Sequence, residues 1–381
     1  MPAKRTNESM TEENSMATSQ TGPQEELQLI PTNAGGRSFA GPPKALQSQV
    51  TPTDLFYVRN HWKGAPEIDI ESYRLSVGGE VAQALSLSMD ELKSMQHRRY
   101  QATFECCGNG PIPEYWAKQT RSVMEKVTGH GIMGNAEWVG VSLADVLNMA
   151  EIGPNAVEVM FEGADHGPDE VVGDPEEVTY ERSLPMEKAL HPDTMLAWEM
   201  NGEPLTPLHG YPLRLVVPGW YGMCSVKWLA AIHVLDEEFK GFYQIERYRV
   251  MNGPDADEFY TYLTGMRVKS IITDPAPGDL VPVGDYVVSG AAWSGESDIT
   301  RIEVSTDGGE TWTDARITAP RSGYSWTRWE CDWAIPAAGN YVLMSRATND
   351  KGETQPMEFP NKWDGMGYGN NMVFRHDVEV V

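Results

Sequence analysis

Hydrophobic and polar residues alternate in short runs from about Thr53 to Thr264. Runs in which every second residue is apolar predict half-buried strands, and apolar residues three or four positions apart predict short helices. Gly- and Pro-rich segments between the runs predict long connecting loops, so this region is expected to be a mixed α+β domain. The expected strands are Tyr73–Val77, Val157–Phe161, Leu213–Val217 and Ile232–Leu235, and the expected helices are Met89–Met95 and Ser142–Met149, with Ser142 as the N-cap of the second.

From about Met266 the pattern changes to short strands separated by turn residues roughly every 8 to 12 positions. Six or seven such strands over about 115 residues predict an all-β immunoglobulin-like sandwich. The expected strands are Val268–Ile272, Tyr286–Ala292, Ile299–Ser305, Thr311–Ile317, Trp326–Trp333, Tyr341–Thr348 and Val373–Val380.

The chain of 381 residues is longer than a single hydrophobic core normally supports, so two domains are expected. We assign residues 1–30 to a flexible tail, residues 31–264 to the α+β domain and residues 265–381 to the sandwich. The first 28 residues are polar and lack the apolar core of a secretory signal, which predicts a cytoplasmic protein. No run approaches the roughly 18 apolar residues of a membrane span, so no membrane association is expected.

The formal net charge is −25, from 55 acidic and 30 basic residues. Nucleic-acid binding is therefore not expected, because it requires a strongly basic surface. The four cysteines are too few for a disulfide framework and are not spaced as a zinc pair, a haem-attachment motif or an iron–sulfur set. They are Cys106, Cys107, Cys224 and Cys331.

Two motifs resemble known sites but have simpler explanations. Gly129–Gly134 fits the glycine pattern of dinucleotide-binding loops, but no clear strand precedes it and the next helical pattern starts only at Ser142. Ser305–Trp312 resembles the repeated hairpin of sialidase propellers, yet it occurs once. We interpret the first as a glycine loop and the second as a turn through Asp307 between two strands.

The segment Phe104–Gly110 carries the most informative chemistry, with the sequence F-E-C-C-G-N-G. It places a thiol after a strand-like run, where glycines let the backbone approach a bulky ligand. A thiolate is a soft metal ligand. A buried structural cysteine would have a similar local sequence, so the segment alone leaves both interpretations open.

Basic residues within apolar loop segments strengthen the functional interpretation. They occur in Phe56–His61 (F-Y-V-R-N-H), His209–Arg214 (H-G-Y-P-L-R) and Ser225–Trp228 (S-V-K-W). Each alone is explained by a local ion pair or a core histidine. Together, in a chain with few basic residues, they indicate an anionic ligand, for which a phosphate is the natural candidate.

With these motifs, the chain resembles the catalytic core and dimerisation domain of the sulfite oxidase family of molybdopterin-dependent oxidoreductases, from about Asp54 to Val381. Further segments that carry the resemblance are Ala136–Val141, Ser183–Ala189, Ala197–Gly202, Val216–Gly222 and Glu303–Trp312. The resemblance implies a molybdopterin-binding domain of α+β type followed by an immunoglobulin-like domain. It also implies one molybdenum per chain and two-electron oxo transfer to or from a small substrate.

The resemblance also implies roles for individual residues. Cys106 matches the metal ligand, and Arg59 matches an arginine that faces the substrate anion. Phe239 stands where the family has its active-site tyrosine, so Tyr243 and Tyr248 are the candidates to replace it. The positions that match the lining of the pterin and its phosphate are Tyr57, Val58, Arg59, Asn60, His61, Asp165, Ser183, His209, Arg214, Ser225, Val226 and Lys227.

Three departures from the family pattern concern the substrate. Gly110 and Pro111 occupy the place of an arginine, Phe239 that of the tyrosine, and residues 363–371 lack an arginine found in some relatives.

The favoured activity is oxidation of sulfite to sulfate. A molybdenum-dependent reductase of an S-oxide, an N-oxide or nitrate is the alternative, and a binding protein without cofactor is the non-enzymatic one. We expect no haem on this chain and an external electron carrier, and the resemblance implies a homodimer through the sandwich.

Overall fold

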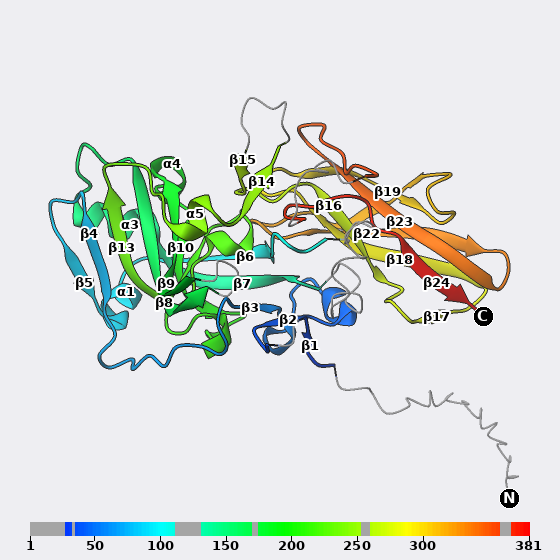
Figure 1. Ribbon diagram of the computed structural model, residues 1–381. Helices are drawn as coiled ribbons and strands as arrows, with labels where there is room; N and C mark the ends of the chain where they lie inside the picture. Colours follow the sequence, from blue (N-terminus) through cyan, green and yellow to red (C-terminus); the bar gives the residue numbers. More distant parts are fainter. Residues whose placement is uncertain (1–26, 33–34, 111–130, 170–173, 253–259, 359–366) are drawn as a thin grey trace, which may run out of the picture.

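The computed structural model describes residues 27–32, 35–110, 131–169, 174–252, 260–358 and 367–381. They form two bodies, one of mixed sheets and short helices and one of two packed sheets near the C-terminus (Figure 1). Within these ranges, no helix combines the length and the hydropathy needed to cross a membrane.

One sheet of the first body is antiparallel. β6 (His97–Glu105) pairs with β7 (Met133–Ser142), which pairs with β10 (Met195–Met200). β11 (Glu203–Pro204) and β12 (Arg214–Val216) both pair with β10. Nearly every residue of β7 is buried on both faces, so this sheet lies inside the body.

The second sheet of the first body has the strand order β5-β4-β13-β8-β9. Its strands are β4 (Leu75–Gly79), β5 (Leu85–Leu87), β8 (Glu158–Asp169), β9 (Asp174–Pro185) and β13 (Leu229–Leu235). β4 and β13 run parallel, and the other pairs are antiparallel. β8 continues well beyond the expected strand because it forms a long hairpin with β9.

Short helices connect these sheets. α1 (Met89–Ser94) begins with a capping box, in which Glu91 N donates to Ser88 Oγ at 3.3 Å and Ser88 N donates to the Glu91 carboxylate at 2.8 Å. α3 (Leu143–Ala150) has Ser142 at its N-cap, as predicted, although that side chain makes no capping hydrogen bond. Other helical turns in the described ranges are Pro43–Leu46, Thr53–Leu55, α4 (Met186–Ala189), Pro207–His209, Gly222–Cys224 and α5 (Phe242–Ile245).

Two small sheets complete the described part of the first body. β1 (Ile30–Pro31), β2 (Ser38–Ala40) and β3 (Val58–Arg59) form one, and β14 (Arg249–Met251) pairs with β15 (Tyr260–Tyr262) in the other. Most of the tail expected at residues 1–30 lies outside the described residues.

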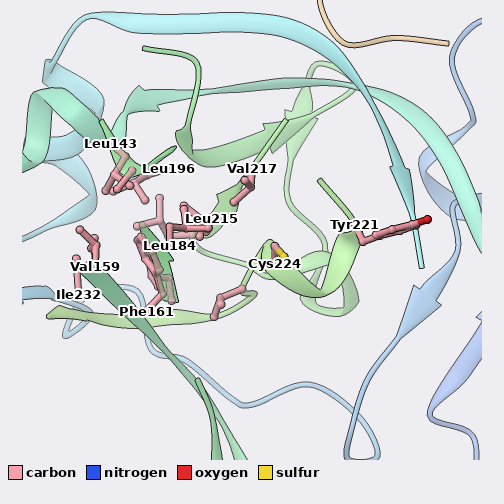
Figure 2. Packing of buried hydrophobic residues seen from close by; sticks show 14 of the residues in the cluster. Leu143, Val159, Phe161, Leu184, Leu196, Leu215, Val217, Tyr221, Cys224 and Ile232 are labelled. Carbon is pink, nitrogen blue, oxygen red and sulfur yellow. The ribbon is translucent and has the colours of Figure 1, made fainter. Parts of the chain in front are cut away.

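Apolar side chains from both sheets form the core of the first body. Figure 2 shows part of this cluster, and the five side chains Phe161, Leu184, Leu196, Leu215 and Ile232 are each 0 % exposed. Burying a side chain of this size stabilises a fold by about 1.5–3 kcal/mol. The core therefore fixes the strand ends from which the loops with candidate chemistry emerge.

The C-terminal body is the predicted immunoglobulin-like sandwich. One sheet has the order β16 (Lys269–Asp274), β18 (Gly284–Trp293), β22 (Thr327–Ile335), β21 (Arg316–Ala319). The other has the order β17 (Leu280–Val281), β24 (His376–Val380), β23 (Gly339–Asn349), β19 (Ile299–Ser305), β20 (Thr313–Asp314). Inward-facing residues of both sheets, such as Trp329 and Leu343, form its core.

The single strand expected at Thr311–Ile317 is wrong. The chain changes sheets at Ala315, whose N–H donates to Ile302 O at 2.9 Å. β20 before it pairs with β19, and β21 after it pairs with β22. The alternation of apolar and polar residues does not reveal such a change because both halves remain extended.

The two motif interpretations agree with the described residues. Gly129 and His130 lie outside them, but Met133 already begins β7, so a strand rather than a helix follows the glycines. In the second motif, the Asp307 carboxylate accepts hydrogen bonds from Thr311 N at 2.9 and 3.0 Å. This turn joins the paired strands β19 and β20.

Candidate functional site

Cys106 lies at the point where the chain leaves β6. Its N–H donates to Ile132 O at 2.9 Å, and Asn109 N donates to Cys106 O at 2.8 Å, so residues 106–109 form a tight turn. Gly110 follows it against the backbone of Asn370, where a Cβ atom would come within 2.9 Å of the carbonyl oxygen. Glycine is therefore required at position 110 by close backbone contact.

The Cys106 side chain lines a pocket of about 700 Å³, including its part open to solvent. The pocket brings together most of the predicted site residues, which come from six separate segments of the sequence. Those predicted residues are Tyr57, Val58, Arg59, Asn60, His61, Cys106, Asp165, His209, Arg214, Ser225, Lys227 and Tyr248.

Three predicted residues do not line this pocket. Val226 is fully buried in the core, and its carbonyl oxygen accepts from Leu215 N at 2.8 Å. Ser183 lies on β9 and is 2% exposed, and its N–H donates to Gln244 Oε1 at 3.4 Å. Tyr243 packs behind His61, with ring centroids 4.5 Å apart.

Several pocket residues, most of them apolar or aromatic, were not predicted from the sequence. Nothing in their local sequence distinguishes them from core residues, because their role is to shape the walls. They are Phe56, Phe104, Tyr180, Leu208, Gly222, Met223 and Trp228.

Tyr248, rather than Phe239 or Tyr243, brings a phenol to the pocket. Its hydroxyl shares a hydrogen bond of 2.5 Å with His61 Nε2. Tyr248 has a positive φ of 55°, an uncommon conformation for a residue other than glycine, which redirects the chain after α5. Phe239 does not line the pocket, and its N–H donates to the Glu158 carboxylate at 3.0 Å.

The pocket favours the thiolate form of Cys106. A hydrogen bond with the Cys107 side chain lowers the pKa of Cys106 to about 7, and the positive charge of Arg59 acts in the same direction against burial. Burial raises the pKa of the Cys107 thiol. Of the two adjacent cysteines, Cys106 is therefore the better metal ligand near neutral pH.

Cations accumulate on one side of the pocket. Burial lowers the pKa of Lys227, and the nearby charge of Arg214 lowers it further. Burial lowers the pKa of Arg214 to about 10, while its guanidinium lies 5.0 Å from the ring centroids of both Phe104 and Trp138. Asp165 is the nearby carboxylate, and burial raises its pKa to about 6. The pocket thus favours an anionic ligand.

Both imidazoles of the pocket are neutral at physiological pH. Burial is the main cause, and it lowers the pKa of His209 to about 3 and the pKa of His61 well below its ordinary value. The charges of Arg214 and Lys227 add to the effect on His209, and that of Arg59 to the effect on His61. A neutral imidazole has one donor and one acceptor nitrogen, which suits hydrogen bonding to a polar ligand.

Comparisons with known proteins agree with this arrangement. Residues 62–243 match the oxidoreductase molybdopterin binding domain, and residues 261–381 match the Mo-co oxidoreductase dimerisation domain. The sulfite oxidase of Gallus gallus is 35% identical over 348 residues, which cover 86% of this chain and 73% of that protein. The mitochondrial sulfite oxidase of Rattus norvegicus is 32% identical over 89% of this chain, which spans only 63% of that protein's length.

A solved structure is similar over nearly the whole chain. The sulfane dehydrogenase SoxCD from Paracoccus pantotrophus superposes with a TM-score of 0.78 at 29% identity, covering 97% of this chain and 96% of that one. The fold, the pocket and these matches lead to one conclusion: the chain belongs to the sulfite oxidase family of molybdopterin-dependent oxidoreductases.

Proposed function

We propose that this protein is a molybdenum-cofactor-dependent oxidoreductase that oxidises sulfite. Sulfite and water give sulfate, two protons and two electrons, and an external carrier accepts the electrons. The observation that carries this proposal is the pocket in which the Cys106 thiol, Arg59 and the buried cations meet. It combines a soft metal ligand with charge suited to both a phosphate and an oxyanion.

The residues present fit a molybdopterin-type cofactor. Asp165 Oδ1, His209 Nε2 and Arg214 Nε are buried without a hydrogen-bond partner among the described residues. Unpaired buried polar atoms cost free energy unless a ligand satisfies them. The described residues contain no group of three or more His, Cys, Asp or Glu side chains placed to hold a metal ion. Cys106 therefore fits a metal that is held mainly by an organic carrier.

When bound, the cofactor supplies the redox chemistry of the oxygen-atom transfer. Cys106 would hold its metal, and Lys227, Arg214, His209 and Asp165 would hold its polar carrier. Arg214 is already oriented for this role, because its guanidinium donates to His209 O at 2.9 Å and to Ser225 O at 3.3 Å.

Arg59 and Tyr248 are the side chains that we assign to the substrate. Arg59 lies on the exposed side of the pocket, where its charge attracts an oxyanion. Burial raises the pKa of Tyr248, so its hydroxyl keeps its proton near neutral pH. With His61 Nε2 as the donor of their shared hydrogen bond, the hydroxyl can donate to the substrate. His61 fixes the position of this hydroxyl through their hydrogen bond.

A second candidate substrate is a sulfane sulfur. Gly110 stands where the resemblance expects an arginine, so the anion pocket carries less positive charge than a sulfite dianion favours. The similarity to a sulfane dehydrogenase over 97% of the chain supports the same alternative. Both candidates are sulfur nucleophiles that lose two electrons, so one assay format serves for both.

The test is rapid-mixing spectroscopy of the purified cofactor-loaded enzyme. We expect sulfite to reduce the oxidised enzyme at least as fast as it turns over in a steady-state assay, in which ferricyanide is the electron acceptor. Reduction by glutathione persulfide but not by sulfite would replace the first candidate by the second. Reoxidation of the dithionite-reduced enzyme by dimethyl sulfoxide, trimethylamine N-oxide or nitrate, without reduction by either donor, would contradict both and favour the reductase.

Tyr248→Phe is expected to lower kcat/KM for the substrate about tenfold, the kinetic equivalent of one hydrogen bond worth roughly 1.4 kcal/mol. Tyr243→Phe is the matched control, because Tyr243 is a buried tyrosine of the same aromatic group that lies behind the pocket. Steady-state kinetics with both variants check the assignment. Equal losses of kcat/KM in the two variants would contradict the assignment of Tyr248 to the substrate site.

We also infer that the chain forms a homodimer through its sandwich. The match of residues 261–381 to a dimerisation domain supports this, and the sandwich exposes large apolar side chains such as Leu280 at 62% and Val283 at 46%. A symmetric interface would cover such residues. Light scattering at micromolar concentration should give twice the chain mass of 42.3 kDa. The cytoplasmic location stays a prediction.

A further inference from the structure

A buried ion pair connects the two bodies directly beside Cys106. Glu105 is the last residue of β6 and is 0% exposed, and Lys269 is the first residue of β16 in the sandwich and is 1% exposed. Their side chains form a salt bridge. The pair therefore joins the residue that precedes the candidate metal ligand to the C-terminal body.

Both oxygens of the Glu105 carboxylate have further partners. Trp293 of β18 donates from Nε1 to Oε2 at 2.9 Å, and Asn109 donates from Nδ2 to Oε1 at 3.1 Å. Lys269 Nζ also donates to Asn109 O at 2.7 Å. Two residues of the sandwich thus hold both ends of the turn that contains Cys106.

The same turn has another contact with the C-terminal segment. Gly369 N donates to Cys107 O at 2.7 Å, and Arg267 donates to Gly369 O at 3.1 Å. On the opposite side, Ile132 N donates to Asn109 Oδ1 at 3.3 Å. The turn that carries Cys106 is therefore held by groups from the sandwich as well as by β6 and the residue that precedes β7.

A buried ion pair is a poor source of stability in itself, because desolvation offsets much of the attraction between the charges. Removing one partner leaves an uncompensated buried charge. The neighbouring polar groups must then move to stabilise that charge. Here those groups are the backbone and side chain of Asn109, within the Cys106 turn. A change at Lys269 therefore acts first on Asn109, within the turn that carries Cys106.

We propose that Glu105 is a positioning residue, and that through Lys269 and Trp293 the sandwich sets the position of the Cys106 sulfur. The C-terminal domain is then part of the metal site in addition to its role in dimerisation. The proposal rests on the proposed function only in that Cys106 is the metal ligand. The geometry of the turn itself is testable without cofactor.

The first experiment uses the full chain without cofactor and measures the rate at which iodoacetamide alkylates Cys106, by mass spectrometry of its peptide. We expect Glu105→Gln and Lys269→Met each to change this rate at least about fivefold at temperatures where the protein is folded. The double variant Glu105→Gln/Lys269→Met removes both charges and should return the rate toward that of the parent. Glu303→Gln is the matched control, because Glu303 forms a mostly buried pair with Arg346 inside the sandwich, at 2.8 and 3.0 Å.

The second experiment uses the cofactor-loaded enzyme and compares EPR spectra of the one-electron-reduced form with kcat and KM. The single variants should shift the spectrum and lower kcat by roughly tenfold, the usual scale for residues behind a metal ligand, with little change in KM. Folded variants with parental alkylation rates and parental spectra would overturn the proposal. Where a charge variant fails to fold, Trp293→Phe removes a single hydrogen bond and is judged by the same criteria.

The two experiments also separate this proposal from the proposed function. An enzyme without molybdenum in cells that can supply the cofactor would refute the function. Altered alkylation in the cofactor-free variants would still support the coupling between the sandwich and the turn. Parental alkylation rates and spectra in a fully active molybdenum enzyme would refute the coupling alone.

Discussion

Cys106→Ser is expected to lower substrate turnover by roughly 100-fold or more, because even residues behind a metal ligand cost about 10- to 100-fold when they are changed. The pocket lowers the pKa of the Cys106 thiol to about 7, so the soft thiolate forms readily near neutral pH. A serine hydroxyl keeps its proton under these conditions and is a hard ligand. Ferricyanide-linked assays and the molybdenum content per chain measure the effect.

Cys107→Ser is the control for this prediction. Cys107 lies next to Cys106, is 1% exposed and keeps its thiol protonated, because burial raises its pKa. A serine at position 107 still offers a hydrogen bond to the sulfur of Cys106, so we expect turnover within a few-fold of the parent. Full activity in Cys106→Ser together with a loss of activity in Cys107→Ser would show that Cys107 is the metal ligand instead.

Lys227→Met and Arg214→Met are expected to weaken retention of the cofactor. Truncating one partner of a buried charge pair costs about 2–5 kcal/mol, which corresponds to roughly 30- to 5,000-fold in affinity. The measurement is the cofactor content after dialysis of the loaded enzyme. Lys188→Met is the control, because Lys188 is a buried lysine that pairs with Glu296 outside this pocket. Loss of cofactor from Lys188→Met to the same degree would show a general folding defect instead.

The stability of the cofactor-free protein should depend on the protonation of Lys227. The folded protein holds the pKa of Lys227 below its ordinary value of 10.5, mainly by burial, so between these two pKa values the unfolded chain binds more protons. The contribution of Lys227 to the free energy of unfolding therefore rises with pH between the two pKa values and is lost as the pH falls through them. Lys227→Met should lack that part of the rise when urea unfolding is compared with the parent from neutral to alkaline pH.

The sequence predicted the part of the site where several basic residues occur together in apolar segments. Arg59 and Lys227 are cations within apolar loop segments of an acidic chain, and both line the pocket. It did not distinguish Tyr243 from Tyr248, which are only five positions apart. The backbone conformation at Tyr248 decides which phenol reaches His61, and a non-glycine residue with positive φ has no clear signal in a single sequence.

The sequence by itself determined the division into an α+β part and a sandwich, because the spacing of apolar residues and turns reflects which faces each segment buries. Together with the resemblance to the family, it also identified Cys106 as the candidate ligand, because the first cysteine of the Phe104–Gly110 segment matches the family's metal ligand. Only the tertiary structure decided which distant residues surround that sulfur. Glu105 and Lys269 are 164 positions apart, and their pairing follows from how two bodies pack, which no local pattern encodes.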